Sequence, residues 1–435
     1  MPEKTRPGRP LIMDAVRYVH AADLHLDVAF KGAVSQFEDV SRSGRQLWEA
    51  TFTALERLVR LCERERPDFV VLAGDIYNEE DHSLRAQFAL RDACKRLEAH
   101  GISVFIAHGN HDPLTSRLAA LEWPSNVVFF GSDVEAHPVF RNGQQIALVH
   151  GISHASSAEG RNLARFFRRS AANSCFQLGV LHCSLDDSDR YAPCSKSDLV
   201  STGLDAWALG HVHKRQIVSK SPLIAYSGNI QGLHINEQGP KGCNLVTATP
   251  VEGGWDFEAD FRHLGPVQWE TVEVDLCGAK TMDEVARLLE RALLRARENV
   301  APECQVIIAR VILQGNTDMD GSLHKTDALQ ILADQASFLT SQVPAVWIKD
   351  IRLQTRPACN PENYIERDDL VGEVARICRN MASDREKFEE FAKNRLASLF
   401  DNPRLNKLLT MPRGEMLEKI LAEAERICLE RLEKS

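Results

Sequence analysis

The sequence predicts an α/β protein that ends in a helical region, and three observations carry this prediction. In roughly the first half of the chain, short apolar runs typical of buried strands alternate with segments of helical periodicity. A shorter round of the same alternation follows, and the remainder is strongly charged and helical throughout. We therefore expect a flexible extension, a main α/β domain, a small α/β domain and a helical region, over residues 1–15, 16–265, 266–358 and 359–435.

The composition is that of a globular protein. Of the 435 residues, 44% are hydrophobic and 26% are charged, which excludes a disordered or fibrous chain. A protein that coats DNA is usually basic overall, so the net charge of −9 means that any contact with nucleic acid has to use a local basic patch. The excess of carboxylates also suits a protein that binds divalent metal ions.

Neither a membrane segment nor a disulfide framework is expected. No apolar run approaches the roughly 20 residues that span a bilayer. The first residues lack the apolar core of a signal peptide. The 11 cysteines include no C-x-x-C pair and fit reduced, mostly buried thiols, so we predict a cytoplasmic protein.

The main domain is expected to open with a short apolar strand that runs into polar residues, over 17–27. A helix follows between Trp48 and Cys62, where apolar residues recur on one face, and Pro67 ends it. The order then continues with a strand, a helix and four strands, at 68–75, 84–100, 102–113, 144–153, 176–185 and 205–213. Each strand runs into His, Asp or Asn, and ligands of open α/β sheets bind at the carboxyl ends of strands.

The character of the sequence changes after the main group of strands. A β-hairpin is expected over 244–264, with Gly253 and Gly254 as its turn. The small domain is predicted as strand, helix, strand, helix and strand, over 269–276, 282–300, 304–315, 325–343 and 345–354. From about Tyr364 onward the chain is expected to be almost wholly helical.

Five short polar pieces follow the predicted strands of the main domain. Taken singly, each fits an ordinary turn or a structural histidine, but their recurrence in one periodic fold favours a shared site. They supply only oxygen and imidazole-nitrogen donors, which suit Mn, Fe, Zn or Mg ions better than a structural zinc site. A pair of cations needs a shared carboxylate, and Asp75 follows a glycine that permits a sharp turn. The pieces are Asp23-Leu24-His25, Gly74-Asp75, Gly109-Asn110-His111-Asp112, His182 and Gly210-His211-Val212-His213.

In this order the pieces D-x-H, G-D, G-N-H-D, a single H and G-H-x-H resemble the signature of the calcineurin-like metallophosphoesterases, over residues 18–230. The stretches G-H-V-H-K-R-Q, Y-S-G-N-I-Q-G and K-G-C-N-L-V resemble the SbcD and YhaO branch of DNA-repair exonucleases. The resemblance implies a four-layer α/β/β/α metallophosphoesterase domain followed by a small α/β capping domain. It also implies C-terminal helices that bind the coiled coil of an SMC-like ATPase.

The resemblance further implies a role for each polar residue. Asp23, His25 and His213 would hold a first metal ion, Asn110, His182 and His211 a second, and Asp75 would bridge the two. His111 would stand beside the scissile phosphate as general acid or electrostatic stabiliser, and Asp112 would orient it. Mn²⁺ is the expected ion, with Fe²⁺, Zn²⁺ and Mg²⁺ as alternatives. Cys183, beside His182, is expected to face the core because side chains alternate along a strand.

Two positions depart from the pattern of this branch. Many relatives carry a histidine three residues after the bridging Asp, where this chain has Asn78. Either a second helper at the phosphate is missing, or His82 takes its place. Relatives also often carry an arginine where this chain has Leu233, which would remove one phosphate contact.

A cluster of arginines has two competing interpretations. It either forms a helix that presents guanidinium groups to a phosphate backbone, or lies on a solvated helix whose Phe166 and Phe167 pack inward. For an acidic protein this is the best candidate for a basic, substrate-binding patch. The cluster consists of Arg161, Arg165, Arg168 and Arg169.

The last predicted helix carries an apolar stripe. Such a stripe either packs on its own chain or, as the resemblance implies, binds a partner such as the SMC-like ATPase. A homodimer is a further alternative that the sequence leaves open. The stripe consists of Leu417, Ile420, Leu421, Ala424, Ile427 and Cys428.

Together these features predict a two-metal, Mn-dependent phosphodiester hydrolase that acts on DNA, as an exonuclease in DNA repair. One alternative is a general phosphoesterase for nucleotides or phosphoproteins, but such an enzyme gains little from a second domain and a helical region. The other is a non-catalytic scaffold on the same fold. A scaffold would be expected to have lost metal ligands, whereas all the expected ligands are present here.

Overall fold

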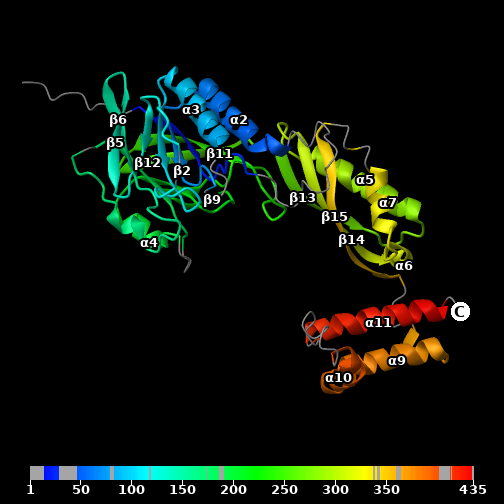
Figure 1. Ribbon diagram of the computed structural model, residues 1–435. Coiled ribbons are helices and arrows are strands. Elements are labelled where there is room, and N and C mark those ends of the chain that lie inside the picture. The colour runs from blue at the N-terminus through cyan, green and yellow to red at the C-terminus, as the bar shows by residue number, and fades with distance from the viewer. Residues whose placement is uncertain are drawn as a thin grey trace, which may run out of the picture. The chain divides into compact units, whose positions relative to one another are not determined.

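The chain forms the predicted alternation of strands and helices in a computed structural model (Figure 1). The structure describes residues 14–28, 47–78, 83–116, 119–172, 174–185, 191–336, 339, 343–358, 364–400, 412 and 414–433. Residues 1–13 of the predicted extension and His82 lie outside the described residues. The chain divides into two compact units. The first comprises 1–271, 296–310 and 339–349, and the second 272–295, 311–338 and 350–435.

The first of two six-stranded sheets has the strand order β12-β11-β1-β2-β3-β4. Strands β1 to β4 are parallel, and β11 and β12 continue the sheet as an antiparallel hairpin. The hairpin turn is Glu252-Gly253, one residue earlier than predicted, because Val251 already pairs with Gly254. The bounds are β1 Val16–Ala21, β2 Phe69–Ala73, β3 Ser103–Ala107, β4 Val127–Phe129, β11 Gly242–Val251 and β12 Gly254–His263.

The second six-stranded sheet has the order β5-β6-β7-β8-β10-β9. Strands β6, β7, β8 and β10 are parallel, while β5 and β9 pair antiparallel at the two edges. The carboxyl ends of its central strands therefore lie at one end of the sheet. The bounds are β5 Glu135–Arg141, β6 Gln144–Gly151, β7 Phe176–His182, β8 Ala206–Gly210, β9 Gln216–Lys220 and β10 Leu223–Tyr226.

The two sheets pack face to face and helices cover both outer faces, which confirms the predicted α/β/β/α layers (Figure 1). Between the sheets, the ring of Tyr18 stacks on Phe69 at 5.3 Å and on Phe176 of the second sheet at 5.8 Å. Helices α2 and α3 share a buried core with the first sheet, and α4 and a short 3-10 helix, η2, share one with the second. The bounds are α2 Ala50–Glu65, α3 Leu84–Glu98, η2 Leu163–Phe166 and α4 Lys196–Ser201.

The ends of α2 and α3 follow from local sequence. Helix α2 ends at Glu65 because Arg66 adopts a left-handed conformation (φ +51°) directly before Pro67. Helix α3 begins after Ser83, whose hydroxyl accepts a hydrogen bond from the N–H of Ala86. Trp48, predicted to start the buried face of α2, lies before the helix and is exposed.

A third sheet of order β13-β14-β15 follows, with helices between its strands. Buried Val285, Leu289 and Leu293 recur every four residues along α5, as its apolar pattern predicts. A helix is predicted over 325–343, and the observed helix α7 spans Ala328–Gln335. The bounds are β13 Val267–Asp275, α5 Met282–Glu298, β14 Val306–Thr317, α6 Asp320–Leu323, α7 Ala328–Gln335 and β15 Ala345–Pro357.

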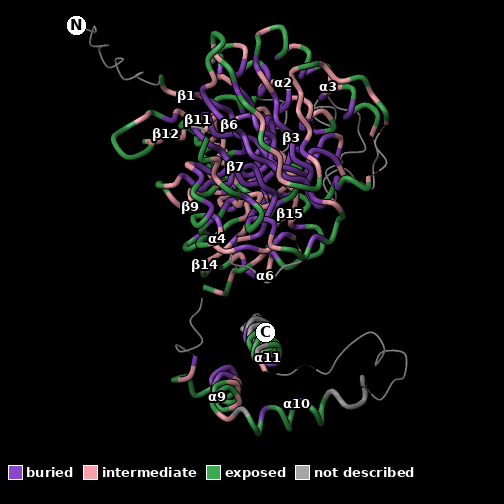
Figure 2. The backbone as a smooth tube through the Cα atoms, turned by 90° about the vertical axis from the view of Figure 1, so that its left-hand side faces the viewer, coloured by how far each residue is buried: buried purple, intermediate pink, exposed green. Residues whose placement is uncertain are grey.

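The C-terminal region is helical as predicted, with α9 Leu370–Ser383, α10 Arg385–Phe400 and α11 Glu415–Glu433. Figure 2 shows long exposed stretches on α10, in contrast to the buried strands of the two large sheets. No helix among the described residues is long and apolar enough to cross a membrane.

The predicted stripe on α11 divides between two faces. Leu417 and Leu421 are buried in one small core with Phe388 of α10, and Leu429 is buried in another with Val371 of α9. The inner face therefore repeats about every four residues, and the intervening apolar residues turn outward. The exposed members of the predicted stripe are Ile420, Ala424, Ile427 and Cys428.

Candidate metal centre

The polar residues predicted from the sequence meet where parallel strands of both sheets end. Asp23 follows β1, Asp75 follows β2 and Asn110 follows β3. His182 is the last residue of β7, and His211 follows β8 directly. The N–H of His211 donates to Asp23 Oδ1 at 3.0 Å, which ties a loop of the second sheet to a loop of the first.

Asp23, His25 and His213 form one group of ligands. One donor atom of each lies within 4.8 Å of the others, and the Nε2 atoms of His25 and His213 are 3.2 Å apart. These are the three residues expected to hold a first metal ion. Two ring nitrogens that both carry a free lone pair repel each other at this distance. Either one of them carries a proton or a cation lies between them.

Asn110, His182 and His211 form a second group. Asn110 Oδ1 lies 3.0 Å from His182 Nε2 and 3.2 Å from His211 Nδ1. The structure thus brings together the three residues expected to hold a second ion. Asp23 and Asp75 also lie within 4.8 Å of His182, so the two groups are contiguous.

Asp75 lies between the two groups. Its Oδ2 is 3.9 Å from His25 Nε2 and 3.4 Å from His182 Nε2, while Oδ1 accepts a hydrogen bond from the N–H of His111 at 2.8 Å. This is the position expected for a carboxylate that bridges two ions. Asp23, Asp75 and His182 are all buried, and a buried carboxylate is costly unless a cation or hydrogen bonds compensate its charge.

Two of the four candidate histidine ligands are held neutral by their surroundings. Burial lowers the pKa of His25, and burial together with the neighbouring His182 lowers the pKa of His211 to about 4. Both rings are therefore neutral near pH 7, the form in which imidazole binds metals. Burial raises the pKa of Asp23, so its ionised form needs a compensating positive charge. The donor set thus fits divalent cations of the Mn, Fe, Zn or Mg type.

The backbone is strained at four of these residues. Asp23, His25, Asp75 and His211 have φ angles of +50°, +42°, +51° and +101°, in the left-handed region that disfavours side chains. Such strain collects at functional sites, where the surrounding structure over-determines the conformation.

The glycines beside the ligands are required by close approach. A Cβ atom at Gly210 would lie 1.8 Å from Ala73 O, and one at Gly109 would lie 2.3 Å from Asp75 Oδ1. A Cβ at Gly74, which also has φ +90°, would lie 2.4 Å from His182 Nδ1. The sequence predicted tight turns at these positions, and the structure adds that the loops touch one another there.

Three of the four candidate histidine ligands are held from behind through Nδ1. Asn78 Oδ1 lies 2.8 Å from His25 Nδ1, and Glu237 Oε1 lies 2.6 Å from His213 Nδ1. The backbone oxygen of Ala73 lies 3.0 Å from His182 Nδ1. In each case Nε2 faces the other ligands. Asn78, which departs from the pattern of relatives, therefore supports a candidate ligand in this chain.

Sequence reasoning missed Glu237. This residue is buried, and the hydrogen bond to His213 lowers the pKa of its carboxyl group to about 2 against the effect of burial. It is the one carboxylate between residues 221 and 240, a stretch otherwise poor in charge, and that isolation could have marked it. Leu233, the second departure from the pattern, donates its backbone N–H to Glu237 Oε2 at 2.7 Å.

His111 is exposed beside the cluster, with its ring centroid 5.1 Å from that of His25. Among the described residues no hydrogen bond joins Asp112 to His111, and the prediction that Asp112 orients His111 stays a prediction. Asp112 Oδ1 accepts from the N–H of Gly109 at 2.7 Å, and Oδ2 accepts from the N–H of Ile76 at 3.0 Å. Neighbouring residues of a tight turn point in different directions, so the carboxylate faces the backbone donors of the loop and holds its shape.

The arginine cluster does not form the predicted helix but surrounds the single turn of η2. Three of its guanidinium groups have carboxylate partners, since Arg161 pairs with Glu159, Arg165 with Asp198 and Arg169 with Asp205. Arg168 donates to the backbone oxygens of Arg165 and Phe167. Phe167 is buried, whereas Phe166 is exposed. A contact between this cluster and DNA stays a prediction.

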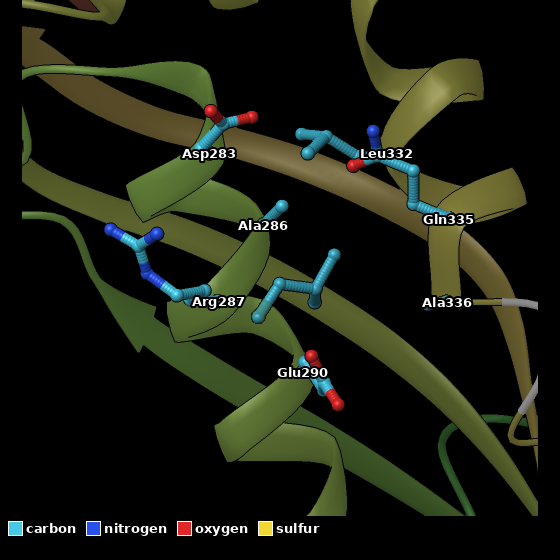
Figure 3. A pocket seen from close by; sticks show the side chains of 8 residues that line it. Asp283, Ala286, Arg287, Glu290, Leu332, Gln335 and Ala336 are labelled. Atoms are coloured by element: carbon cyan, nitrogen blue, oxygen red, sulfur yellow. The ribbon is translucent and has the colours of Figure 1, made fainter.

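The molecule has two further features, a buried cysteine and a groove. Cys183 is fully buried in the core outside the second sheet, as predicted. In the second unit, side chains of α5 and α7 line a groove of about 310 Å³, which includes Asp283, Arg287 and Gln335 (Figure 3). None of the catalytic, metal-binding or DNA-binding residues predicted from the sequence lines this groove.

Comparison with known families gives two matches. The family described as calcineurin-like phosphoesterase matches residues 16–215, which include every candidate ligand. The middle domain of metallophosphoesterase YhaO matches residues 269–356, which correspond to the third sheet and its helices.

Individual relatives agree with these matches. The uncharacterized metallophosphoesterase YhaO of Bacillus subtilis is 38% identical over 303 residues, which cover 68% of this chain and 71% of the relative. The DNA double-strand break repair protein Mre11 of Aeropyrum pernix is 28% identical, over 70% of this chain and 78% of the relative. That of Methanocaldococcus jannaschii is 25% identical, over 63% and 73%. A dimetal phosphatase from Danio rerio aligns with 57% of this chain and 98% of its own, at 16% identity and a TM-score of 0.32.

Proposed function

The chain belongs to the calcineurin-like phosphoesterase family, and from this premise we propose that it is a two-metal phosphodiester hydrolase that acts on DNA as an exonuclease. The observation that carries the proposal is the position of Asp75, whose Oδ2 faces His25 on one side and His182 on the other. A carboxylate placed between two ligand groups would be shared by a pair of divalent cations. The similarity to two Mre11 proteins supports DNA as the substrate.

In this proposal Asp23, His25 and His213 hold one ion, Asn110, His182 and His211 hold the other, and Asp75 is shared. Mn²⁺ is the proposed ion, with Fe²⁺, Zn²⁺ and Mg²⁺ as alternatives. When bound, such a pair supplies an activated water and neutralises charge on the reacting phosphate. The protein supplies imidazoles and buried carboxylates, which it holds in place through strained loops and through hydrogen bonds to Nδ1 of three of the rings.

His111 is proposed to act on the substrate. Its backbone N–H is fixed to Asp75 Oδ1, yet its side chain is exposed at the edge of the cluster. An imidazole in that position can donate a proton to the leaving oxygen as the phosphodiester bond breaks. Asp112 supports this role indirectly, because it holds the loop that carries His111.

The experiment that tests the proposal uses the purified full chain with Mn²⁺ on four substrates. These are linear duplex DNA, linear single strands, circular single strands and a chromogenic phosphodiester. An exonuclease degrades the linear strands and spares the circle, because a circle has no end. An Asp75→Ala variant purified in the same way controls for contaminating nucleases.

Other outcomes would identify other functions. Cleavage of circular strands would indicate an endonuclease. Hydrolysis of the chromogenic ester alone would indicate a general phosphoesterase, and the absence of both reactions would indicate a scaffold on the same fold.

The SMC-like ATPase implied by the family resemblance is proposed as the partner of α11. Ile420 and Ile427 support this, since their side chains are 41% and 38% exposed while the inner face of the helix packs on α9 and α10. Changing both to Asp should abolish binding of the purified ATPase without lowering the melting temperature. Lys419→Ser, on an exposed position of the same helix, is the control. Unchanged binding by the double variant would contradict the proposal.

A further inference from the structure

Glu237 is a buried carboxylate whose oxygens are both occupied by hydrogen-bond donors. Oε2 accepts from the backbone N–H of Leu233 at 2.7 Å and from Asn229 Nδ2 at 2.8 Å. Oε1 faces His213 Nδ1 at 2.6 Å, and His234 Nε2 approaches it to 3.2 Å. The nearby Lys241 donates instead to the backbone oxygen of His213. In the described part of the chain, histidines are therefore the only ion-pair partners of this carboxylate.

The chemistry of a carboxylate decides which nitrogen of His213 carries the proton. An ionised carboxylate can only accept hydrogen bonds, so Nδ1 of His213 has to donate and, in the neutral ring, Nε2 keeps the lone pair. That Nε2 atom is the one that lies 3.2 Å from His25 Nε2, inside the cluster.

The partner of His25 cannot impose the same choice. An amide group presents an oxygen or an NH₂ group depending on its orientation, so Asn78 is compatible with either tautomer of His25. Of the two side chains behind the first ligand group, only Glu237 determines a tautomer.

We infer that Glu237 is a positioning residue of the metal centre, which holds His213 in the tautomer that offers Nε2 to the first ion. This inference rests on the proposed two-metal function. Carboxylates behind metal-binding histidines raise the basicity of the ligand, and their loss costs about 10- to 100-fold in metal affinity.

Glu237→Gln is the sharpest test because it should change the tautomer of His213. The donors Leu233 N–H and Asn229 Nδ2 still require an acceptor, so the amide oxygen of the new side chain has to face them. Its NH₂ group then faces His213 Nδ1 and favours the opposite tautomer, in which Nε2 carries the proton. Glu237→Asp keeps the charge and should restore most of the affinity.

A matched control exists on β5. Glu135 Oε1 accepts from the N–H of Gly131 at 2.9 Å, and Oε2 lies 2.9 Å from His137 Nε2. Glu135→Gln therefore makes the same chemical change beside a histidine that is not a candidate ligand. It should leave metal binding unchanged.

Two measurements on the full chain decide the matter. Calorimetric titration of metal-free protein with Mn²⁺ should show that Glu237→Gln weakens one of two sites about 10- to 100-fold. Nitrogen NMR of metal-free protein labelled at histidine, at a pH where the rings are neutral, should show His213 protonated at Nδ1 in the parent chain and at Nε2 in the variant. Melting in EDTA reports whether the variant is folded.

A folded Glu237→Gln protein that binds two Mn²⁺ ions as tightly as its parent would overturn the inference. If the variant does not fold, the NMR spectrum of the parent chain decides, and His213 protonated at Nε2 would overturn it equally. Both measurements are independent of hydrolysis. A chain that binds Mn²⁺ as described but does not cut DNA would therefore refute the proposed function and leave this inference standing.

Discussion

The two ligand groups of the candidate metal centre form its two halves, and they are held by different kinds of group. Side chains support the first half, and backbone groups support the second. In the first half, the rings of His25 and His213 are held by the side chains of Asn78 and Glu237. In the second half, the ring of His182 faces the backbone oxygen of Ala73, and His211 donates its own N–H to Asp23. Substitutions of the side chains behind the ligands should therefore tune the first half, whereas the support of the second half should be disturbed by changes that move the strands.

The largest effect is expected at the residue that both halves share. Asp75→Ala should reduce hydrolysis to background and lower the Mn²⁺ stoichiometry, because its carboxylate faces both ligand groups. EDTA should have the same effect on the parent chain. Adding back Mn²⁺ should restore the parent but not the variant, and Ca²⁺, which favours more oxygen ligands, should restore neither. Hydrolysis that survives thorough chelation would refute a metal-dependent mechanism altogether.

The second half should lose its metal ion when the backbone around it is displaced. In Gly210→Ala the new Cβ would lie 1.8 Å from Ala73 O, so β8 or the loop after β2 has to shift. Overpacking of this kind costs about 1–3 kcal/mol in the free energy of unfolding. We expect a lower melting temperature and loss of Mn²⁺ from the site of His182 and His211. Gly160→Ala, where a Cβ meets open space, is the control. Normal metal binding by the Gly210 variant would mean that the close approach is dispensable.

A substitution outside both halves should separate chemistry from metal binding. His111→Ala should leave the Mn²⁺ content unchanged and lower the turnover rate about 100-fold or more, the usual scale for a positioned acid. Elemental analysis alongside the rate measurement checks this. Loss of metal in the variant would make His111 a ligand and would assign it to one of the two halves.

The smallest effect is expected from Asn78→Ala. It removes the side chain behind His25 but leaves the ring free to adopt either tautomer, so we expect about a tenfold loss of affinity at one Mn²⁺ site. Titration calorimetry beside Glu237→Gln measures the difference between the two supports of the first half. A fall in turnover at saturating Mn²⁺, without a change in affinity, would instead place Asn78 at the phosphate.

Local patterns were sufficient to predict the order of strands and helices and the polar side chains at the strand ends, and the family resemblance implied the layers and the ligand roles. Apolar runs marked the central strands, and each predicted ligand proved to lie at or just after a strand end. Patterns that depend on tertiary packing were less informative. Two of the arginines around η2, Arg165 and Arg169, pair with Asp198 and Asp205, 33 and 36 positions away, which no local spacing indicates. On α11, periodicity marked apolar residues but not which of them face α9 and α10.

The sequence by itself determined the alternation of strands and helices and the set of side chains at the strand ends, because periodicity reports burial and parallel strands end at a common edge. The four α/β/β/α layers were implied by the family resemblance that these side chains carry. Only the tertiary structure decided which atom of each ligand faces the centre. His25 is held by a residue 53 positions away and His213 by one 24 positions away. A hydrogen bond between such distant loops exists only once the strands have paired and the chain has folded. The orientation of an imidazole, and with it the lone pair that binds a metal, therefore cannot be read from local sequence.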